Sequence, residues 1–518
     1  RVEEHLAPLA NVHKLRDTAK CRLALQVQLQ INRFCANTSL NYFMRIMGPA
    51  ASRLAAHRHD ALVEAAFHKI VGTASATHAE RSRAVQQARL PVKMGGLGLT
   101  AMSDTLDAAC VGSWALCWHQ MKEMCPQLFA HMDIVAYPLP AFKELRAAHA
   151  TLQTTRRRMD AIYREIDAAY YDYDKAGEGH TQFHPEHLPP AHKLEPLTAY
   201  SERSKFHFGA QREYSLVIHH ANWFNFMLRL RQSAPRREAV RFMSASQPYA
   251  GAFLNAVPRY AEYQVATPLL RVAVQRRLGL PLLEAAAAAG RRGRHGRLLD
   301  VLGDVAQNDG EEGHAARHHL VLAAIYDALR RVAGAGSVTK EPQNYHDYSN
   351  HRPDLTTSYD GFKIWDLKML DPLGSTPGTS VGQRGAFVGM GNTAWAAREL
   401  VRGREARGGE SAFNPLTGRG QVAALPGDYA KAQRLGHFVS ELCVETFGGL
   451  GSTLVELIKE AAAMRGNKLT HGEYEAEATW STRKFTPFVM QRISVAIQIA
   501  AASEIRQALG MSLALSAA

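Results

Sequence analysis

Long apolar runs and paired cysteines are both missing from this sequence. No uninterrupted stretch comes near the roughly 18 apolar residues that a membrane-spanning helix requires, so we expect no membrane partner. The chain has only six cysteines among 518 residues, and no two of them form a CxxC pair. Such sparse cysteines argue for a reducing compartment and against a disulfide framework.

A signal-peptide pattern is missing as well, and the first residue is Arg1. We therefore expect the sequence to be a fragment, or a segment of a longer polyprotein. A length of 518 residues exceeds what one hydrophobic core organises and predicts about two to four domains. With 46% hydrophobic and 21% charged residues, the composition is typical of soluble globular proteins.

Positive charge, in contrast, is abundant and unevenly distributed. The net charge is +13, and residues 201–300 alone hold sixteen Lys and Arg against six Asp and Glu. A concentrated basic region favours a polyanionic partner, nucleic acid before membrane. The alternative is the solvated face of a helical domain.

Helical periodicity dominates the first two thirds of the chain. Residues 1–170 carry apolar residues at three- and four-residue intervals, which predicts a helical region. Residues 171–204, rich in proline, histidine and tyrosine, predict a linker. Residues 205–300 are helical again, and we expect this basic region to bind nucleic acid. Within it, the tract at 291–297 predicts a flexible cationic loop that contacts phosphates.

The last third, 310–518, predicts a compact α/β domain. The segment 315–333 reads as an amphipathic helix, with Gly334 where a C-cap glycine belongs. The element order is helix, strand, strand, strand, helix, strand, and further helices close the chain. We expect strands at 337–341, 354–358, 362–369 and 442–447, and helices near 394–404 and at 428–436, 452–464 and 487–509.

The stretch RPDLTTSYDGFKIWDLK, residues 352–368, predicts a β-hairpin, because an Asp-Gly turn signal separates two short strands. A two-residue loop would set Asp354 opposite Leu367 and leave the two aspartates on different faces. A three-residue loop would pair Asp354 either with Asp366 or with Lys368.

Either three-residue loop puts two carboxylates and an ammonium group on one face of the sheet, since side chains alternate with a period of two. Such a trio can hold a divalent cation between the carboxylates and set a lysine beside the water that the metal activates. The hairpin therefore indicates machinery for phosphodiester hydrolysis. The alternative is a surface hairpin with a solvated aspartate and lysine.

Several segments together resemble a known family. The chain is similar to the region downstream of the reverse transcriptase core in non-LTR retrotransposon-like open reading frames, and the resemblance spans most of its length. It rests on ARLPVKMGGLGL at 88–99, SASQPYAGAFLNAVP at 244–258, LRVAVQRRLGLP at 270–281, Arg317-His318, Glu341-Pro342, RPDL at 352–355, WDLK at 365–368, VETFGG at 444–449 and QRISVAIQIAAASEI at 491–505.

The resemblance implies that the last third is a restriction-like endonuclease with the αβββαβ core of the PD-(D/E)xK fold. Matched residue by residue, Asp354 and Asp366 would hold Mg²⁺ or Mn²⁺, Lys368 would assist hydrolysis, and Glu341 would add a metal ligand. Three of the basic positions match family residues near the scissile phosphate: Arg317, His318 and Lys431. The other residues expected to contact nucleic acid are Arg352, Arg276, Arg277, Arg291, Arg292 and Arg294.

The sequence departs from the family pattern in two places. Family members carry a cysteine-histidine zinc knuckle just before the nuclease helix, but residues 293–316 contain no cysteine, so no zinc is expected. The metal-binding aspartate pair of a polymerase palm is also missing, so this chain as given is not expected to copy nucleic acid.

The sequence therefore predicts an enzyme, a Mg²⁺-dependent endonuclease that forms part of a retrotransposon-like polyprotein and nicks target DNA for integration. Its expected partners are DNA, element RNA and the polymerase portion of the same polyprotein, and its expected location is the nucleus. The alternative is a catalytically dead remnant that acts as a nucleic-acid-binding or scaffold protein.

Overall fold

The computed structural model is mostly helical, with one small mixed sheet of four strands. It describes residues 24–129, 137–174, 210–293, 296–309, 311–342, 353–373, 436–474 and 482–510. The coarse fold class expected from the sequence, a helical region followed by a region with both helices and strands, is therefore confirmed.

The described residues form two compact units. The N-terminal unit contains those up to Phe242 together with Arg277–Pro281. The C-terminal unit contains Met243–Arg276 and those from Leu282 onward. Residues of the basic region expected at 205–300 contribute to both units.

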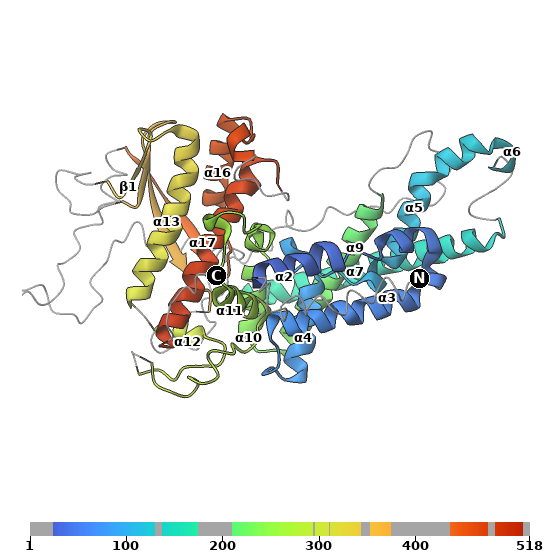
Figure 1. Ribbon diagram of the computed structural model, residues 1–518, viewed down its shortest axis with the longest axis horizontal. Coiled ribbons are helices and arrows are strands. Elements are labelled where there is room, and N and C mark those ends of the chain that lie inside the picture. The colour runs from blue at the N-terminus through green and yellow to red at the C-terminus, as the bar shows by residue number, and fades with distance from the viewer. Residues whose placement is uncertain are drawn as a thin grey trace, which may run out of the picture. The chain divides into compact units, whose positions relative to one another are not determined.

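The N-terminal unit is a bundle of helices in which the long helices α3, α5, α7 and α9 pack together (Figure 1). Aromatic rings fill part of its core: Trp118 and Phe142 are buried, with their ring centroids 5.6 Å apart. The helices are α2 (Leu25–Ile31), the π-helix η2 (Asn32–Ala36), α3 (Asn41–Val71), α4 (His78–Arg89), the 3₁₀-helix η3 (Val92–Met94), α5 (Met102–Met124), α6 (Pro126–Phe129), α7 (Pro140–Asp174), α9 (Ala210–Ser233) and the first part of α10 (Arg236–Ala245).

The loop after α4 is built around a buried glutamine and a buried arginine. Gln87 Nε2 donates to the carbonyl oxygens of Gly95 and Arg277, both at 2.8 Å. The Arg277 guanidinium in turn donates to the carbonyl oxygens of Val92 and Gly96, at 3.0 and 3.3 Å. Two of the segments on which the family resemblance rests therefore fold against each other, and their glycines and arginines serve this packing.

The sheet of the C-terminal unit has the strand order β1-β2-β3-β4. The first three strands form an antiparallel meander, and β4 runs parallel to β3. The register pairs Leu355 with Trp365 and Thr357 with Lys363, which is the register of a three-residue loop centred on Asp360. The strands are β1 (Val338–Lys340), β2 (Leu355–Thr357), β3 (Lys363–Leu370) and β4 (Phe438–Glu445).

Three helices complete the framework around this sheet (Figure 1). Helix α13 (Glu311–Ala333) packs on β1 and β3, α16 (Ser452–Met464) packs on β4, and α17 (Phe485–Ala508) packs on α13. Gly334 follows α13 with a φ of 82° and donates to the Arg330 carbonyl at 3.0 Å, so the predicted C-cap is confirmed. The shorter helices are η5 (Ala252–Asn255), η6 (Ala261–Tyr263), α11 (Thr267–Leu278) and α12 (Asp304–Gln307).

Helix α17 is long and apolar enough to meet the length and hydropathy criteria for a membrane span, but 83% of its most apolar part is buried inside the protein. Polar side chains lie buried along it, among them Ser494 and Glu504. The Ser494 hydroxyl accepts a hydrogen bond from the Phe253 N–H at 3.0 Å. These contacts are typical of the core helix of a folded domain.

Most of the expected elements of the last third are present, with shifted ends. The last strand begins at Phe438, four residues before the predicted start at 442. The helices expected at 428–436 and 394–404, and most of the linker expected at 171–204, lie outside the described residues. The second helix of the expected αβββαβ order, and with it the order as a whole, therefore stays a prediction.

Gly96 offers a test of the N-terminal unit. A Cβ at this position would overlap the backbone carbonyl groups of Leu90 and Gln87, which the surrounding hydrogen bonds hold in place. We expect Gly96→Ala to destabilise the protein by about 1–3 kcal/mol or more. The control is Gly336→Ala, because a Cβ at Gly336 meets no atom within 4 Å. Thermal denaturation that gives both variants the wild-type Tm would contradict this account of the loop.

Candidate functional site

The hairpin β2–β3 brings the two predicted catalytic aspartates together. Asp354 lies just before β2, and Asp366 lies within β3. Continuing the observed register by one residue from the Leu355–Trp365 pair sets Asp354 opposite Asp366. Lys368 follows two residues later along β3, so its side chain leaves the same face of the sheet as that of Asp366.

Direct contacts join these side chains into one cluster. The carboxyl groups of Asp354 and Asp366 are within hydrogen-bonding reach of each other. Lys368 Nζ lies 2.5 Å from Asp366 Oδ2. Asp354 Oδ2 accepts from the Leu367 N–H at 2.6 Å and lies 3.1 Å from Nε2 of His318, which α13 contributes.

The pKa values of the two carboxyl groups are shifted in opposite directions. Burial raises the pKa of Asp366 above the ordinary value, and the charge of Asp354 adds to this effect while Lys368 opposes it. Burial also acts to raise the pKa of Asp354, but hydrogen bonds from His318 and from the Leu367 N–H outweigh it and hold that pKa below its usual range. The same hydrogen bond, which His318 donates to Asp354, raises the pKa of His318.

This donor set fits a hard divalent cation. Mg²⁺ is bound in proteins by one or two carboxylates, with water and substrate phosphate oxygens as its other ligands. Asp354 and Asp366 supply two adjacent carboxylates of this kind, and a cation between them would relieve their repulsion. A larger set is not found: among the described residues, no group of three or more His, Cys, Asp or Glu side chains is placed to hold a metal ion.

Glu341, the third predicted metal ligand, lies apart from this pair. Its backbone N–H donates to the Asp354 carbonyl oxygen at 2.9 Å, so the two main-chain segments pair beside the site. Its side chain, however, pairs with His319, at 3.0 Å between Oε1 and Nε2, and is 34% exposed. The structure therefore gives Glu341 a role in an ion pair beside the site.

Three of the arginines predicted to contact nucleic acid are buried and make contacts within the fold. Arg317 pairs with Glu504 at 2.6 Å, and Arg276 donates to Gln307 at 2.9 Å and covers the Phe447 ring. Arg277 lies in the core of the N-terminal unit, as described above. In this conformation none of the three guanidinium groups presents itself to a polyanion, because each is at most 7% exposed.

The remaining basic predictions divide into two groups. Arg291 and Arg292 are exposed, on a turn ordered by backbone hydrogen bonds such as that from the Leu299 N–H to the Arg291 carbonyl at 2.9 Å. Three residues lie outside the described residues: Arg294, Arg352 and Lys431.

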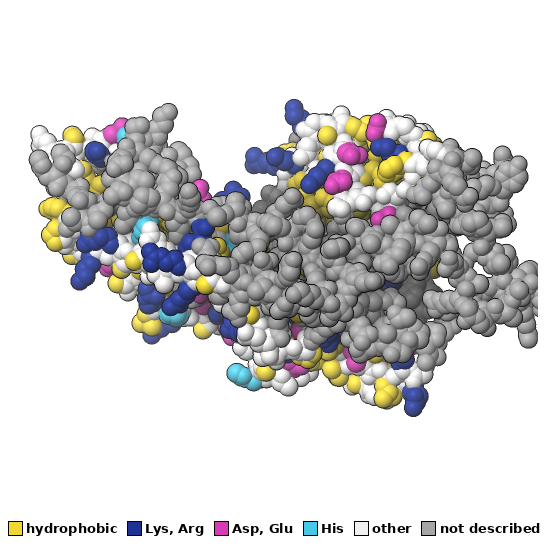
Figure 2. Space-filling view, turned by 180° about the vertical axis from the view of Figure 1, so that it is seen from behind, with side chains coloured by type: hydrophobic (Ala, Val, Ile, Leu, Met, Phe, Trp, Pro, Cys, Tyr) yellow, Lys and Arg dark blue, Asp and Glu magenta, His cyan; other side chains and the backbone are white. Residues whose placement is uncertain are grey.

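The N-terminal unit also carries basic side chains on its surface. Figure 2 shows Lys and Arg side chains gathered on the visible face of this unit, with few acidic side chains among them.

Glu504 is a buried charge that sequence reasoning missed. It accepts from Arg317 and Gln307, and burial raises its pKa to about 7. Arg317 immediately precedes His318, so this contact ties the histidine's helix α13 to α17. No local pattern could have marked Glu504, because 187 residues separate it from Arg317 in the sequence.

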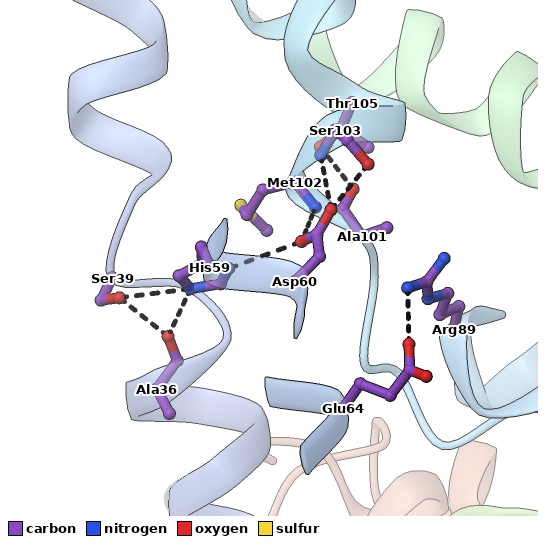
Figure 3. A network of polar contacts seen from close by, with 10 residues as sticks. All are labelled: Ala36, Ser39, His59, Asp60, Glu64, Arg89, Ala101, Met102, Ser103 and Thr105. Atoms are coloured by element: carbon purple, nitrogen blue, oxygen red, sulfur yellow. Dashed lines mark hydrogen bonds and ion pairs between the residues drawn. The ribbon is translucent and has the colours of Figure 1, made fainter. Parts of the chain in front are cut away.

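A second polar network, in the N-terminal unit, has the composition of a nucleophilic triad (Figure 3). Ser39 Oγ lies 3.4 Å from His59 Nε2, and His59 Nδ1 lies 3.5 Å from Asp60 Oδ1. Nε2 also lies 3.0 Å from the Ala36 carbonyl oxygen, and only a protonated Nε2 can donate a hydrogen bond to it. Because a protonated Nε2 cannot accept a proton from Ser39, the arrangement serves the fold and not catalysis. Asp60 meanwhile accepts from the Met102 N–H at 2.7 Å and caps the start of α5.

No family model matches the chain, and no curated protein matches it significantly.

Exchange of each aspartate for asparagine tests the two pKa directions. A raised folded-state pKa means that ionised Asp366 costs stability above the ordinary carboxyl pKa, so Asp366→Asn should keep or raise the wild-type Tm at pH 7.5 in EDTA. A lowered pKa means that Asp354 contributes stability at pH 7.5 that is lost as the pH falls through its folded-state pKa. Asp354→Asn should therefore cost about 1–3 kcal/mol. Equal losses of Tm in both variants would contradict these directions.

Proposed function

We propose that the C-terminal unit is a metal-dependent endonuclease that hydrolyses phosphodiester bonds in DNA. The observation that carries the proposal is the side-by-side placement of the Asp354 and Asp366 carboxyl groups on a sheet, with Lys368 against one and His318 against the other. Two adjacent carboxylates with a lysine and a histidine beside them are groups that can support metal-dependent phosphodiester hydrolysis.

Asp354 and Asp366 would hold Mg²⁺ or Mn²⁺, and the bound ion would activate water and neutralise charge on the phosphoryl oxygens. Lys368, whose side chain is 37% exposed, can reach a scissile phosphate and orient or deprotonate the attacking water. His318 holds Asp354 in place through Oδ2, and its raised pKa favours a positive charge beside the DNA backbone.

The biological setting of the proposal comes from the sequence resemblance. A PD-(D/E)xK endonuclease in a retrotransposon-like polyprotein would nick target DNA and leave a 3′ end for the polymerase portion to extend. The partners would then be DNA and element RNA, and the site of action the nucleus.

The second candidate is a binding protein without catalysis. One observation favours it: Lys368 Nζ lies 2.5 Å from Asp366, so the ammonium group already neutralises a carboxylate that a metal would occupy. In that case the exposed Arg291 and Arg292 would contact phosphates, and the hairpin would serve only the fold. Both candidates predict salt-dependent DNA binding, but only the first predicts strand cleavage that requires a divalent cation.

Loss of either carboxylate should abolish nicking. We expect Asp354→Ala and Asp366→Ala to slow Mg²⁺-dependent relaxation of supercoiled plasmid by about a hundredfold or more, since each removes charge that the transition state requires. The matched control is Asp360→Ala, at the tip of the same hairpin, where the carboxylate is 76% exposed and pairs with Lys363. DNA binding should persist in all three variants, and wild-type nicking rates in both active-site variants would refute the assignment.

Adjacent histidines on α13 allow a matched comparison. His318 contacts Asp354, whereas His319 contacts Glu341. We expect His318→Ala to lower nicking by about 10–100-fold, in the range for residues that orient a metal ligand, and His319→Ala to change it little. The nicking rate measured against Mg²⁺ concentration checks this. Equal effects of the two substitutions on the nicking rate would contradict a role for the contact between His318 and Asp354.

A further inference from the structure

A cavity of about 300 Å³ opens in the N-terminal unit, and no residue of the carboxylate cluster lines it. Its walls come from three segments: the π-helix η2 with the turn that follows it, the loop leading into α5, and one face of α9. From α9 it is lined by Gln211, Ser215 and His219, spaced at four-residue intervals. Its volume is that of a small-ligand site, and π-helices are frequent at functional sites.

The charge of the lining favours an anion. None of the described residues that line the cavity is acidic, and Arg33 is the single Lys or Arg among them. Burial lowers the pKa of Arg33 to about 10, so the guanidinium keeps its positive charge at neutral pH. Burial, together with the charge of Lys93, lowers the pKa of His219 to about 4, so this imidazole is neutral and adds hydrogen-bonding capacity but no charge.

The Arg33 guanidinium is held in a fixed place. It lies over the Phe34 ring, 4.6 Å from the centroid. Arg33 is 7% exposed and lies beside Gly98, where an added Cβ would be in van der Waals contact, at 3.4 Å, with both Nε and Nη2. A preorganised guanidinium fork of this kind suits the oxygen atoms of a phosphate group.

Neutral polar groups surround this single charge. Thr38, Asn41 and Ser215 also line the cavity, and each carries a hydroxyl or an amide group. Gln211 Oε1 accepts from Arg45 Nε at 2.7 Å, so the donor Nε2 is the end of its amide that remains for a ligand. Such a lining matches a ligand that carries hydroxyl groups beside its charge.

We propose that this cavity binds one phosphate ester group that carries hydroxyls, the chemistry of a sugar phosphate unit. One fixed guanidinium among neutral donors matches one phosphate rather than a polyphosphate, which would need further cations or a metal ion. The unit can come from a free sugar phosphate or from a nucleic-acid strand. The proposal is independent of the carboxylate cluster on the hairpin.

Gln211→Glu is the sharpest test, because the new carboxylate can still accept from Arg45 while placing a negative charge in the cavity wall. The control Gln86→Glu introduces the same charge on α4, where Gln86 donates to Ser82 and does not line the cavity. A second cavity variant, Arg33→Gln, removes the positive charge. Thermal denaturation identifies any variant that fails to fold.

Calorimetric titration of the full 518-residue chain would use ribose 5-phosphate, uncharged ribose and a tetrauridylate as probes. We expect Gln211→Glu to weaken phosphate-ester binding at least about tenfold, Gln86→Glu to leave it unchanged, and Asp354→Ala to leave it unchanged. If Gln211→Glu weakens the binding of ribose 5-phosphate, the ligand is a free sugar phosphate. If it weakens the binding of the tetrauridylate alone, the ligand is a nucleic-acid strand. Ribose binding as tight as that of its phosphate, no binding of either phosphate probe, or equal binding by Gln211→Glu and Gln86→Glu would overturn the proposal.

Discussion

The antiparallel register of β2 and β3 is the constraint on which the candidate active site depends. It sets Asp354 opposite Asp366, and a shift by one residue would turn one of the carboxylates to the other face of the sheet. Because the pair is largely buried, neither charge is screened by water, and each carboxyl group takes its character from its neighbour. Asp354 is held ionised by His318, whereas Asp366 is held back from ionisation. Ionised Asp366 is therefore costly for the fold and useful for chemistry, as poorly solvated groups at functional sites often are.

Buried charge of a different kind holds the framework in which this pair lies. Arg317 and Glu504 join α13 to α17, and Arg276 lies against Phe447 just beyond β4. Ser244 donates to the buried Glu445, and the backbone of Gly448 packs on that of Ala250. Segments far apart in the sequence therefore hold together the unit that contains α13 and the hairpin. These contacts give a packing reason for motif residues that have no place in the catalytic proposal.

The hairpin could be predicted from the sequence because its signals are local: an Asp-Gly turn between two short strands with alternating side chains. Its register could not be chosen between the alternatives, because that depends on the backbone of the turn, where Gly361 takes a φ of 74°. The roles of the arginines were beyond local reasoning altogether. A basic run such as Arg276-Arg277 looks the same in a sequence whether it faces solvent or a buried carbonyl, and only tertiary packing decides. The cavity lined by Arg33 also escaped notice, since its walls come from three distant segments.

The central claim is that Asp354 and Asp366 together receive a divalent cation, and the most direct measurement is calorimetric titration of the protein with Mn²⁺ at pH 7.5. Burial makes the ionised Asp366 carboxylate costly, and a cation bound between the two carboxylates would offset that cost. We expect Mn²⁺ binding in the wild type and its loss in Asp366→Asn. Mn²⁺ binding that is unchanged in that variant, or that is undetectable in the wild type, would contradict it.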